Sequence, residues 1–142
     1  MIVVRDIAVG DADAAARLSG ELGYPTPVET MKERIELLAG SVDHAVFVAC
    51  LGEAVVGWID VGVIHHLQSE PRVEIGGLVV ASESRGGGIG RRLLGRAEEW
   101  ALERGLTSVV VRSQIAREGA HRFYLREGYE RTKTSAVFTK NL

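Results

Sequence analysis

The chain has 142 residues, of which 46% are hydrophobic and 25% charged, and this length and composition suit one globular domain that needs no disulfide or metal to stabilise it. Its net charge of −2 gives no global reason to expect a nucleic acid or an anionic membrane as partner. The single cysteine, Cys50, lies in the apolar run AVFVACL, so we expect a buried and reduced thiol.

The N-terminal sequence MIVVRDIAVGD lacks the basic start and the apolar core of a secretory signal. No apolar run approaches the ~20 residues of a membrane span. We therefore expect a cytoplasmic protein that forms a single domain over residues 1–142, because no repeat and no proline- or serine-rich linker interrupts the chain.

The first predicted element is a short strand over residues 2–7, which is rich in β-branched side chains. A helix over about 11–22 follows, with Asp11 or Asp13 as its N-terminal acid and Gly23 as its end.

The segment TPVETMKERIELLAG predicts a second helix, with Thr26 as N-cap, Pro27 at the first helical position and Gly40 at the end. After it, HAVFVACLGEAVVGWIDVGVI alternates as two strands around a turn at Gly52 and Glu53. This pattern predicts an antiparallel hairpin.

The second half alternates between strands and helices. The predicted elements are a strand at 72–81, a helix at about 88–104 ended by Gly105, a buried strand at 106–113, a helix at 116–127 ended by Gly128, and one or two closing strands in 129–142. Strands on both sides of two crossover helices imply a mixed sheet with helices on both faces.

The stretch SESRGGGIGRRLLGRAEEW sets four glycines and several arginines directly before the third helix. Amide groups in the first turn of a helix have no intrahelical partner and carry partial positive charge. Glycines upstream let successive N–H groups converge on an anion, so the pattern predicts a phosphate or diphosphate site. Its candidate residues are Arg85, Gly86, Gly87, Gly88, Ile89, Gly90 and Arg91.

Two other phosphate motifs do not fit this loop. A Walker A loop needs a lysine followed by Ser or Thr after its last glycine, but Arg91 follows Gly90. A dinucleotide fingerprint needs a third glycine where Arg91 stands and an acid at the end of the next strand, but that strand ends in VVVRSQ, which contains no acid. A flexible turn without a ligand is the structural alternative.

The spacing RxxGxG, formed by Arg85, Gly88 and Gly90, resembles the diphosphate-binding motif of the GCN5-related N-acetyltransferase (GNAT) family. The resemblance extends from Val73 to about Glu130 and includes VEIGGLVV before the loop and AREGAHRFYLREGYE after it. It implies an α/β fold with a mixed, mostly antiparallel sheet of six to seven strands, splayed between strands four and five. It also implies acetyl-coenzyme A (acetyl-CoA) as co-substrate.

Gly76 and Gly77 interrupt an otherwise good strand, which indicates a β-bulge or a simple packing accommodation. In the resembled family a bulge here splays the sheet, and the pantetheine arm pairs with the exposed strand. The resemblance therefore assigns Leu78, Val79 and Val80 to cofactor binding, with free N–H groups near Leu78 and Val79 for the thioester oxygen.

Acetyl transfer to an amine also needs a base and an acid. Glu74, four residues before Leu78, matches the family carboxylate and would deprotonate the amine, directly or through water; a solvent-facing charge is the alternative. Tyr124 matches the family tyrosine that protonates the leaving thiolate. The helical spacing of Ala116, Ala120, Phe123 and Tyr124 is also compatible with a plain core stripe.

The sequence departs from the family where many members carry an asparagine after the fifth strand. Here the segment reads RSQIAREG, and Ser113 or Gln114 is expected to substitute. His65 and His66 are adjacent on a strand and point to opposite faces, so no metal site is expected.

The sequence therefore predicts an acetyl-CoA-dependent N-acetyltransferase acting on a primary amine of a small molecule or peptide. Asp60, His65 and Glu70 are expected to attract that amine. A non-catalytic acyl-CoA sensor and an ATP- or NAD-binding protein are the alternatives. No nucleic acid or membrane partner is expected, and a homodimer is left open.

Overall fold

The computed structural model describes every residue from Met1 to Leu142 and separates them into two units, Met1–Val111 and Arg112–Leu142. The first unit contains the whole sheet and three α-helices, and the second contains one α-helix followed by a segment without regular structure. The expectation of one domain over 1–142 stays a prediction.

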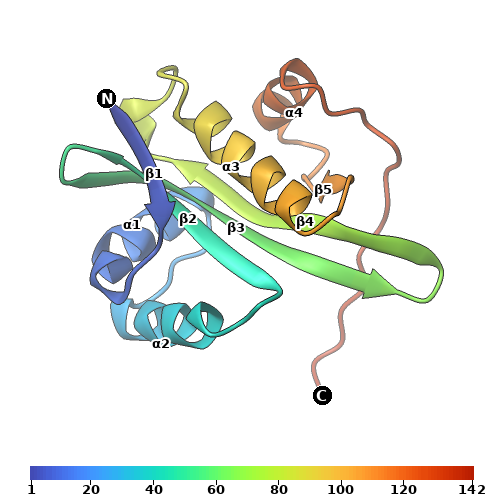
Figure 1. The fold of residues 1–142 in the computed structure, drawn as a ribbon, viewed down its shortest axis with the longest axis horizontal. Helices are drawn as coiled ribbons and strands as arrows, with labels where there is room; N and C mark the ends of the chain where they lie inside the picture. Colours follow the sequence, from blue (N-terminus) through green and yellow to red (C-terminus); the bar gives the residue numbers. More distant parts are fainter. The chain divides into compact units, whose positions relative to one another are not determined.

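The sheet has five strands in the order β1-β2-β3-β4-β5 (Figure 1). They are β1 (Ile2–Asp6), β2 (His44–Leu51), β3 (Ala54–His66), β4 (Ser69–Val80) and β5 (Val109–Val111). The first four pair antiparallel and β5 pairs parallel to β4, so the predicted mixed, mostly antiparallel sheet is confirmed. The sheet has fewer strands than the six or seven expected.

The helices are α1 (Ala12–Leu22), α2 (Val28–Ala39), α3 (Ile89–Glu103) and, in the second unit, α4 (Glu118–Arg126). Two short 3-10 turns, η1 (Val9–Asp11) and η2 (Ser82–Ser84), precede α1 and α3. Gly23, Gly105 and Gly128 follow helices with positive φ angles, as the predicted helix ends require.

Helices cover both faces of the sheet, as predicted. A Cβ atom on Gly57 of β3 would lie 3.2 Å from Leu93 of α3, whereas the indole N–H of the next residue, Trp58, donates to the Ala15 carbonyl of α1 at 3.2 Å. Successive strand residues point to opposite faces. Therefore α3 covers one face and α1 covers the other, together with α2, which packs on β2 (Figure 1).

The core of the first unit lies between these helices and the sheet. Its largest fully buried side chains are Phe47, Leu18, Ile59, Leu93, Leu94, Val48, Val61 and Val73. Cys50 is buried and unpaired, as expected from its apolar neighbours.

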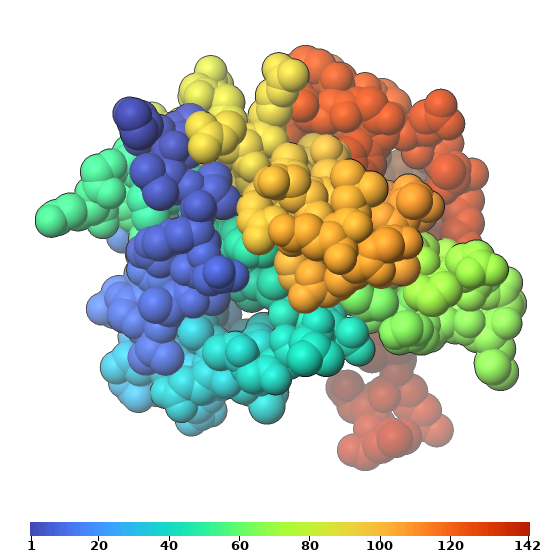
Figure 2. Space-filling view, viewed as in Figure 1, coloured from blue at the N-terminus to red at the C-terminus, as the bar shows by residue number.

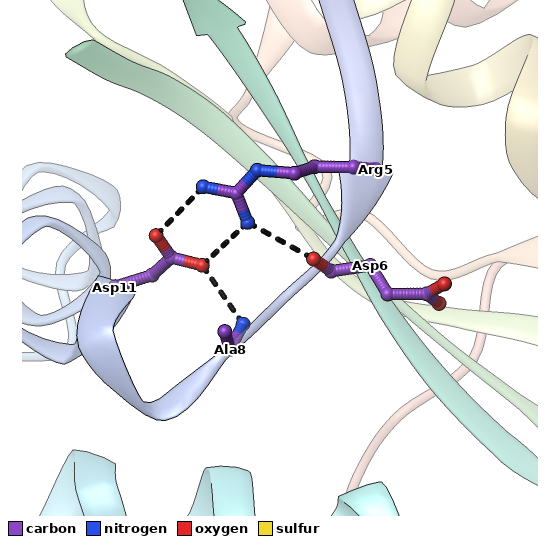
Figure 3. A network of polar contacts seen from close by, with 4 residues as sticks. All are labelled: Arg5, Asp6, Ala8 and Asp11. Carbon is purple, nitrogen blue, oxygen red and sulfur yellow. Dashed lines mark hydrogen bonds and ion pairs between the residues drawn. The ribbon is translucent and has the colours of Figure 1, made fainter. Parts of the chain in front are cut away.

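A buried carboxylate fixes the start of α1 (Figure 3). Arg5 of β1 donates two hydrogen bonds to Asp11, at 2.8 and 2.9 Å, and the Ala8 backbone N–H donates a third at 2.8 Å. These bonds, chiefly the Arg5 pair, lower the pKa of Asp11. The contact therefore ties the first strand to the first helix.

The start of α2 differs from the prediction by one residue. Pro27 is the N-cap, with an extended backbone, and Val28 is the first helical residue. The Thr26 hydroxyl donates to the Tyr24 carbonyl at 2.9 Å and does not cap the helix. A proline fits both positions because its fixed φ suits an N-cap as well as the first helical turn.

Two predictions for the C-terminal third are wrong. The strand expected over 106–113 is only Val109–Val111 and is half-buried, and residues 129–142 form no strand. A strand is stable only when a neighbour accepts and donates its backbone hydrogen bonds. The composition of residues 129–142 favours extended structure, but a favourable composition does not by itself supply a neighbouring strand.

Candidate active site

The predicted bulge lies in β4 at Gly76. Asp60 pairs with Gly77 and the next residue of β3, Val61, pairs with Ile75, so Gly76 is the extra residue. A Cβ on Gly76 would lie 3.1 Å from Asp60 Oδ2, and one on Gly77 would lie 2.9 Å from the Trp58 ring. Both glycines therefore make room for side chains of β3.

The bulge coincides with the end of the pairing between β4 and β5. The parallel register holds only at Val73, Glu74 and Ile75. Beyond Ile75, β4 continues to Val80 with β3 on one side and no strand on the other. This arrangement is the splay that the sequence predicted between strands four and five.

Backbone alternation determines which groups face the open edge of β4. The Ala81 N–H donates to the Val56 carbonyl of β3 at 2.7 Å. Because backbone groups alternate along an antiparallel pair, Val79 also points to β3, and the N–H and C=O groups of Leu78 and Val80 point to the open edge. The N–H groups of Leu78 and Val79 were expected near the thioester oxygen, and of these two only the Leu78 N–H points to the open edge.

The glycine-rich loop connects η2 to α3 with two positive φ angles, 86° at Gly86 and 82° at Gly88. Gly88 is the N-cap of α3 and has a left-handed conformation. A side chain would strain this backbone by about 1–2 kcal/mol at each such position. The two positions need glycine for its conformational freedom and not for lack of space, because a Cβ at either one would meet no atom within 4 Å.

The loop leaves its backbone donors available. The N–H groups of Gly86, Gly87 and Gly88 donate to no other group of the protein, and those of Ile89 and Gly90 lie in the first helical turn, where no intrahelical acceptor exists. The first hydrogen bond that closes the helix runs from Arg92 N–H to the Gly88 carbonyl at 3.1 Å.

Arg85 joins the loop to β4. Its Nε donates to the Val80 carbonyl, which lies on the open edge, at 3.2 Å. The exposed side chains of Arg91 and Arg92 follow in the first turn of α3. The open edge of β4 and the positive start of α3 therefore form one continuous surface.

A groove of about 690 Å³ runs along the other side of the loop, between β1 and α3 (Figure 2). Its lining residues are Ile2, Val4, Gly87, Gly88, Arg91, Arg92, Gly95, Arg96 and Glu99. The Arg96 guanidinium is partly engaged, because it stacks on Phe47 at 4.5 Å and pairs with Glu103. Basic side chains thus extend from the loop for two turns of α3.

Glu74 lies in β4 opposite Gly62 of β3 and is half-buried. Its register places it on the face covered by α1 and α2, on the same side as Asp60, whereas Val73 and Ile75 point to α3. The structure therefore brings the predicted base and one predicted acceptor residue onto one face of the sheet.

Asp60 has a partner that the sequence analysis missed. His44, at the start of β2, hydrogen-bonds through Nε2 to Asp60 Oδ1, and this bond raises the pKa of His44 above its ordinary value. Both side chains are about two-thirds or more buried. The sequence gives no local signal for this pair, because the contact depends on the register of the β2–β3 hairpin.

Arg72 is a second residue that the sequence analysis missed. It lies two residues before Glu74 in β4, so it shares the face of Glu74 and Asp60. Its Nε is buried without a hydrogen-bond partner. A buried donor without a partner is costly in a folded protein, so it calls for an explanation such as a bound water, an ion or a catalytic role.

The other predicted acceptor residues do not join this cluster. His65 lies five residues beyond Asp60 along β3, about 16 Å away at strand spacing, and on the opposite face. Glu70 is exposed at the far end of the β3–β4 hairpin.

Tyr124 lies in α4 of the second unit and is half-buried. Its ring has edge contact with Phe123, at 5.3 Å between centroids, and lies 5.9 Å from the Tyr129 ring. Burial raises the pKa of the Tyr124 hydroxyl, so it stays protonated at neutral pH.

Ser113 follows β5 and its Oγ is buried without a hydrogen-bond partner. Gln114 is exposed, and its backbone carbonyl lies 2.9 Å from His121 Nε2. Of the two residues expected to replace the family asparagine, Ser113 therefore has the unsatisfied polar group.

No three His, Cys, Asp or Glu side chains lie close enough to hold a metal ion together. None of the helices has the length and apolar character needed to cross a bilayer.

The model of the acetyltransferase (GNAT) family matches residues 14–129, which is most of the chain. The chain therefore belongs to this family, and the resemblance seen in Arg85, Gly88 and Gly90 is confirmed at the level of the family.

A characterised relative is the aminoalkylphosphonate N-acetyltransferase of Salmonella typhimurium strain LT2. It is 43% identical over 89 residues, which cover 62% of this chain and 56% of that protein. The chain thus spans little more than half of the length of this relative.

Solved structures share the fold over the whole chain. A protein described as a transcriptional regulator from Bacillus halodurans C-125 superposes with a TM-score of 0.86 at 27% identity, covering 99% of this chain and all of that one. The aminoglycoside N-acetyltransferase AAC(6')-Iy, in complex with CoA, gives 0.88 at 16% identity over 100% and 96% of the two chains. At this identity the second likeness shows the fold alone.

Proposed function

We propose that the protein transfers an acetyl group from acetyl-CoA to a primary amine of a small molecule or peptide by direct attack within a ternary complex. One observation carries the proposal: the open edge of β4 continues into the glycine-rich start of α3 through the bond from Arg85 to the Val80 carbonyl. A thioester carrier presents an amide-bearing arm followed by a diphosphate, so it needs these two surfaces in this order.

The diphosphate would bind at the N-terminus of α3. The available N–H groups from Gly86 to Gly90 supply donors, and Arg85 and Arg91 add positive charge. Ser113, whose hydroxyl has no protein partner, would contact the pantetheine arm.

The pantetheine arm would pair with β4 as an additional strand. Leu78 and Val80 offer backbone groups at the open edge, and Val79 supports them through its pairing with Trp58 of β3. The Leu78 N–H would then stabilise the negative charge that develops on the thioester oxygen as the amine attacks.

Glu74 would accept a proton from the ammonium group of the acceptor, directly or through water, since an alkylammonium has no lone pair for attack. The amine nitrogen then forms a bond to the acetyl carbon while the carbon–sulfur bond breaks. Tyr124 would return a proton to the departing thiolate, and its raised pKa keeps that proton in place at neutral pH.

The charges near Glu74 favour an acceptor that carries both an amine and an anion. Asp60 and Glu74 would attract the ammonium group, and Arg72, with its unpartnered Nε, would bind the anion. The name of the Salmonella relative describes such a molecule, because an aminoalkylphosphonate has an amine at one end and a phosphonate at the other.

A non-catalytic acyl-CoA sensor is the second candidate. The observation that favours it is the solved structure at 27% identity, which is described as a transcriptional regulator. The same open edge and glycine loop would serve a sensor, but Glu74 and Tyr124 would then have no chemical role.

Ligand binding is tested by thermal unfolding with acetyl-CoA, ATP and NAD in parallel. A ligand at a hundred times its Kd stabilises the folded state by about 2.7 kcal/mol, which for this length is a rise of several degrees in Tm. We expect the rise with acetyl-CoA only. A rise with ATP or NAD, and none with acetyl-CoA, contradicts the proposal.

Catalysis is tested by thiol release from acetyl-CoA with a panel of amines that includes aminoalkylphosphonates. Turnover with an amine, lost in Glu74→Gln while the acetyl-CoA shift persists, supports the enzyme. Acetyl-CoA binding without turnover on any amine, unchanged in Glu74→Gln and Tyr124→Phe, identifies the sensor.

A further inference from the structure

Three strands place His44, Gly62 and Glu74 in one row across the sheet. His44 of β2 pairs with Gly62 of β3, and Gly62 pairs with Glu74 of β4. Directly paired residues of antiparallel strands project to the same face of a sheet. His44 and Glu74 therefore stand on either side of Gly62, on the face that carries α1 and α2, and the residue between them has no side chain.

The imidazole ring of His44 occupies the space that Gly62 leaves open. A Cβ atom on Gly62 would lie 3.0 Å from Nδ1 and 3.4 Å from Cε1 of this ring. The ring therefore lies across β3, and its Nε2 donates a hydrogen bond to Asp60, which projects from the same face two residues earlier in that strand. A side chain at Gly62 would displace the ring from this position.

The Asp60 carboxylate connects this histidine to the bulge in β4. Its Oδ1 accepts the hydrogen bond from His44, and its Oδ2 lies 3.1 Å from the position of a Cβ on Gly76. No group of the first unit donates a hydrogen bond to Oδ2. The open edge of β4 begins directly after Ile75. Oδ2 therefore lies beside the start of the edge to which the thioester carrier is proposed to bind.

We propose that His44 is a positioning residue of the acceptor site, which holds Asp60 Oδ2 toward the bulge and releases a proton when the ammonium group of the acceptor reaches that carboxylate. This inference rests on the proposed function, because it gives His44 a role in binding the amine. Protonated His44 and an alkylammonium are both cations, so they compete for the single negative charge of Asp60. The proton of His44 passes to the solvent, and no covalent bond to a heavy atom changes.

The surroundings of His44 favour this exchange. The hydrogen bond with Asp60, opposed by burial, raises the pKa of His44 above its ordinary value. The elements packed around the ring carry further ionisable side chains, which are the acids Asp6, Asp43 and Glu74 and the bases Lys32, Arg72 and Arg104. Among all of these groups only Asp60 forms a hydrogen bond with the ring. An ammonium group at Asp60 therefore weakens the main cause of the raised pKa.

The affinity for the acceptor should consequently rise with pH. Below the raised pKa of His44 the site already holds a cation beside Asp60, and the acceptor must displace its proton. Above this pKa the ring is neutral, and the ammonium group binds without that competition.

Calorimetry with aminopropanesulfonate measures the released proton. Both charged groups of this probe keep their charges at neutral pH, and CoA without an acetyl group is present so that no transfer occurs. Titrations in two buffers of different ionisation enthalpy, at about pH 7, give the number of protons released. We expect up to about one proton per site for the wild type and none for His44→Gln, whose amide can donate to Asp60 but does not titrate.

Steady-state kinetics with the amine that the wild type acetylates best separate positioning from chemistry. KM should fall about threefold to tenfold from about pH 6 to about pH 8 in the wild type, and His44→Gln should lack this fall. His44→Ala, which leaves Asp60 unsupported, should raise KM about threefold to tenfold at every pH, with little change in kcat. Gly62→Ala should act in the same direction, because its Cβ displaces the ring.

His66→Gln is the matched control. It makes the same change of side chain at the end of β3, where His66 is exposed and lies six residues beyond Asp60. This variant should keep the proton release and the pH dependence of KM of the wild type.

The outcomes distinguish this inference from the proposed function. Proton release by the wild type that His44→Gln loses, together with a KM that no longer depends on pH, supports the role of His44. Equal proton release or equal pH profiles in the two proteins overturn that role, and continued turnover by the wild type then leaves the proposed function intact. A wild type that neither binds nor acetylates any amine overturns the proposed function and this inference with it. Thermal unfolding shows whether His44→Ala and Gly62→Ala are folded, and His44→Gln decides where they are not.

Discussion

The glycine-rich loop before α3 and the C-terminal residues 130–142 are both exposed and lie outside helices and strands, yet they differ in composition. The loop has positive φ angles at Gly86 and Gly88 and leads into a helix N-terminus, so its N–H groups gather at one place. Residues 130–142 have no regular secondary structure, and they include the β-prone residues Thr132, Val137 and Phe138.

The comparison shows that an unpaired backbone group does not by itself specify a ligand. Clustered donors without acceptors suit an anion, whereas alternating donors and acceptors suit another strand. We therefore assign the loop to the proposed reaction.

The largest effect is expected at Glu74, which, like the loop, belongs to the proposed reaction. Glu74→Gln should lower kcat about a hundredfold to ten-thousandfold, because the amine loses its general base. Acetyl-CoA binding should not change. Glu70→Gln in the same strand is the matched control, since Glu70 is exposed at the far end of the hairpin. An equal loss in both variants would remove Glu74 from the chemistry.

A smaller effect is expected at Arg72, which we assign to the anion of the acceptor. Arg72→Gln should raise KM for an aminoalkylphosphonate about tenfold to a hundredfold, as expected for a lost hydrogen bond to a charged group. KM for an alkylamine without an anion should stay the same. If both values of KM rise together, Arg72 has only a structural role.

The loop itself is tested by a pair of glycine substitutions in open space. Gly88→Ala places a side chain at a φ of 82°, and the strain of about 1–2 kcal/mol should weaken acetyl-CoA binding about fivefold to thirtyfold. Gly95→Ala, in the interior of α3, should preserve binding and stabilise the helix by about 1 kcal/mol. Equal affinity in the two variants, measured by calorimetry, would show that the loop conformation does not hold the ligand.

The smallest effect concerns His44 and Asp60, polar groups that do find a partner within the chain. Asp60 raises the pKa of His44, so the pair stabilises the fold below the unfolded His44 pKa of about 6.5 and loses this contribution as the pH rises through the folded value. His44→Gln should lower Tm by about 2–4 °C at pH 6, for about 1 kcal/mol, and by less at pH 9. A Tm difference that grows with pH would reverse this sign and contradict the assignment.

Much of the site was predictable from local patterns. Glycines and arginines before a helix indicate an anion site because the chemistry depends on neighbouring residues, and Gly76 predicts its bulge for the same reason. His44 and Arg72 were not predictable, because their partners and faces depend on the register of three strands. Nor did the sequence separate Asp60 from His65, which lie on opposite faces of one strand.

The sequence by itself determined the helices, the β2–β3 hairpin, the loop before α3 and the family, since all of these depend on residues close together in the chain. Only the tertiary structure decided that the pairing of β4 with β5 stops at Ile75 and which side-chain charges share a face. The physical reason is that a strand is stabilised by hydrogen bonds to a neighbouring strand, and its own residues do not specify which segment that neighbour is.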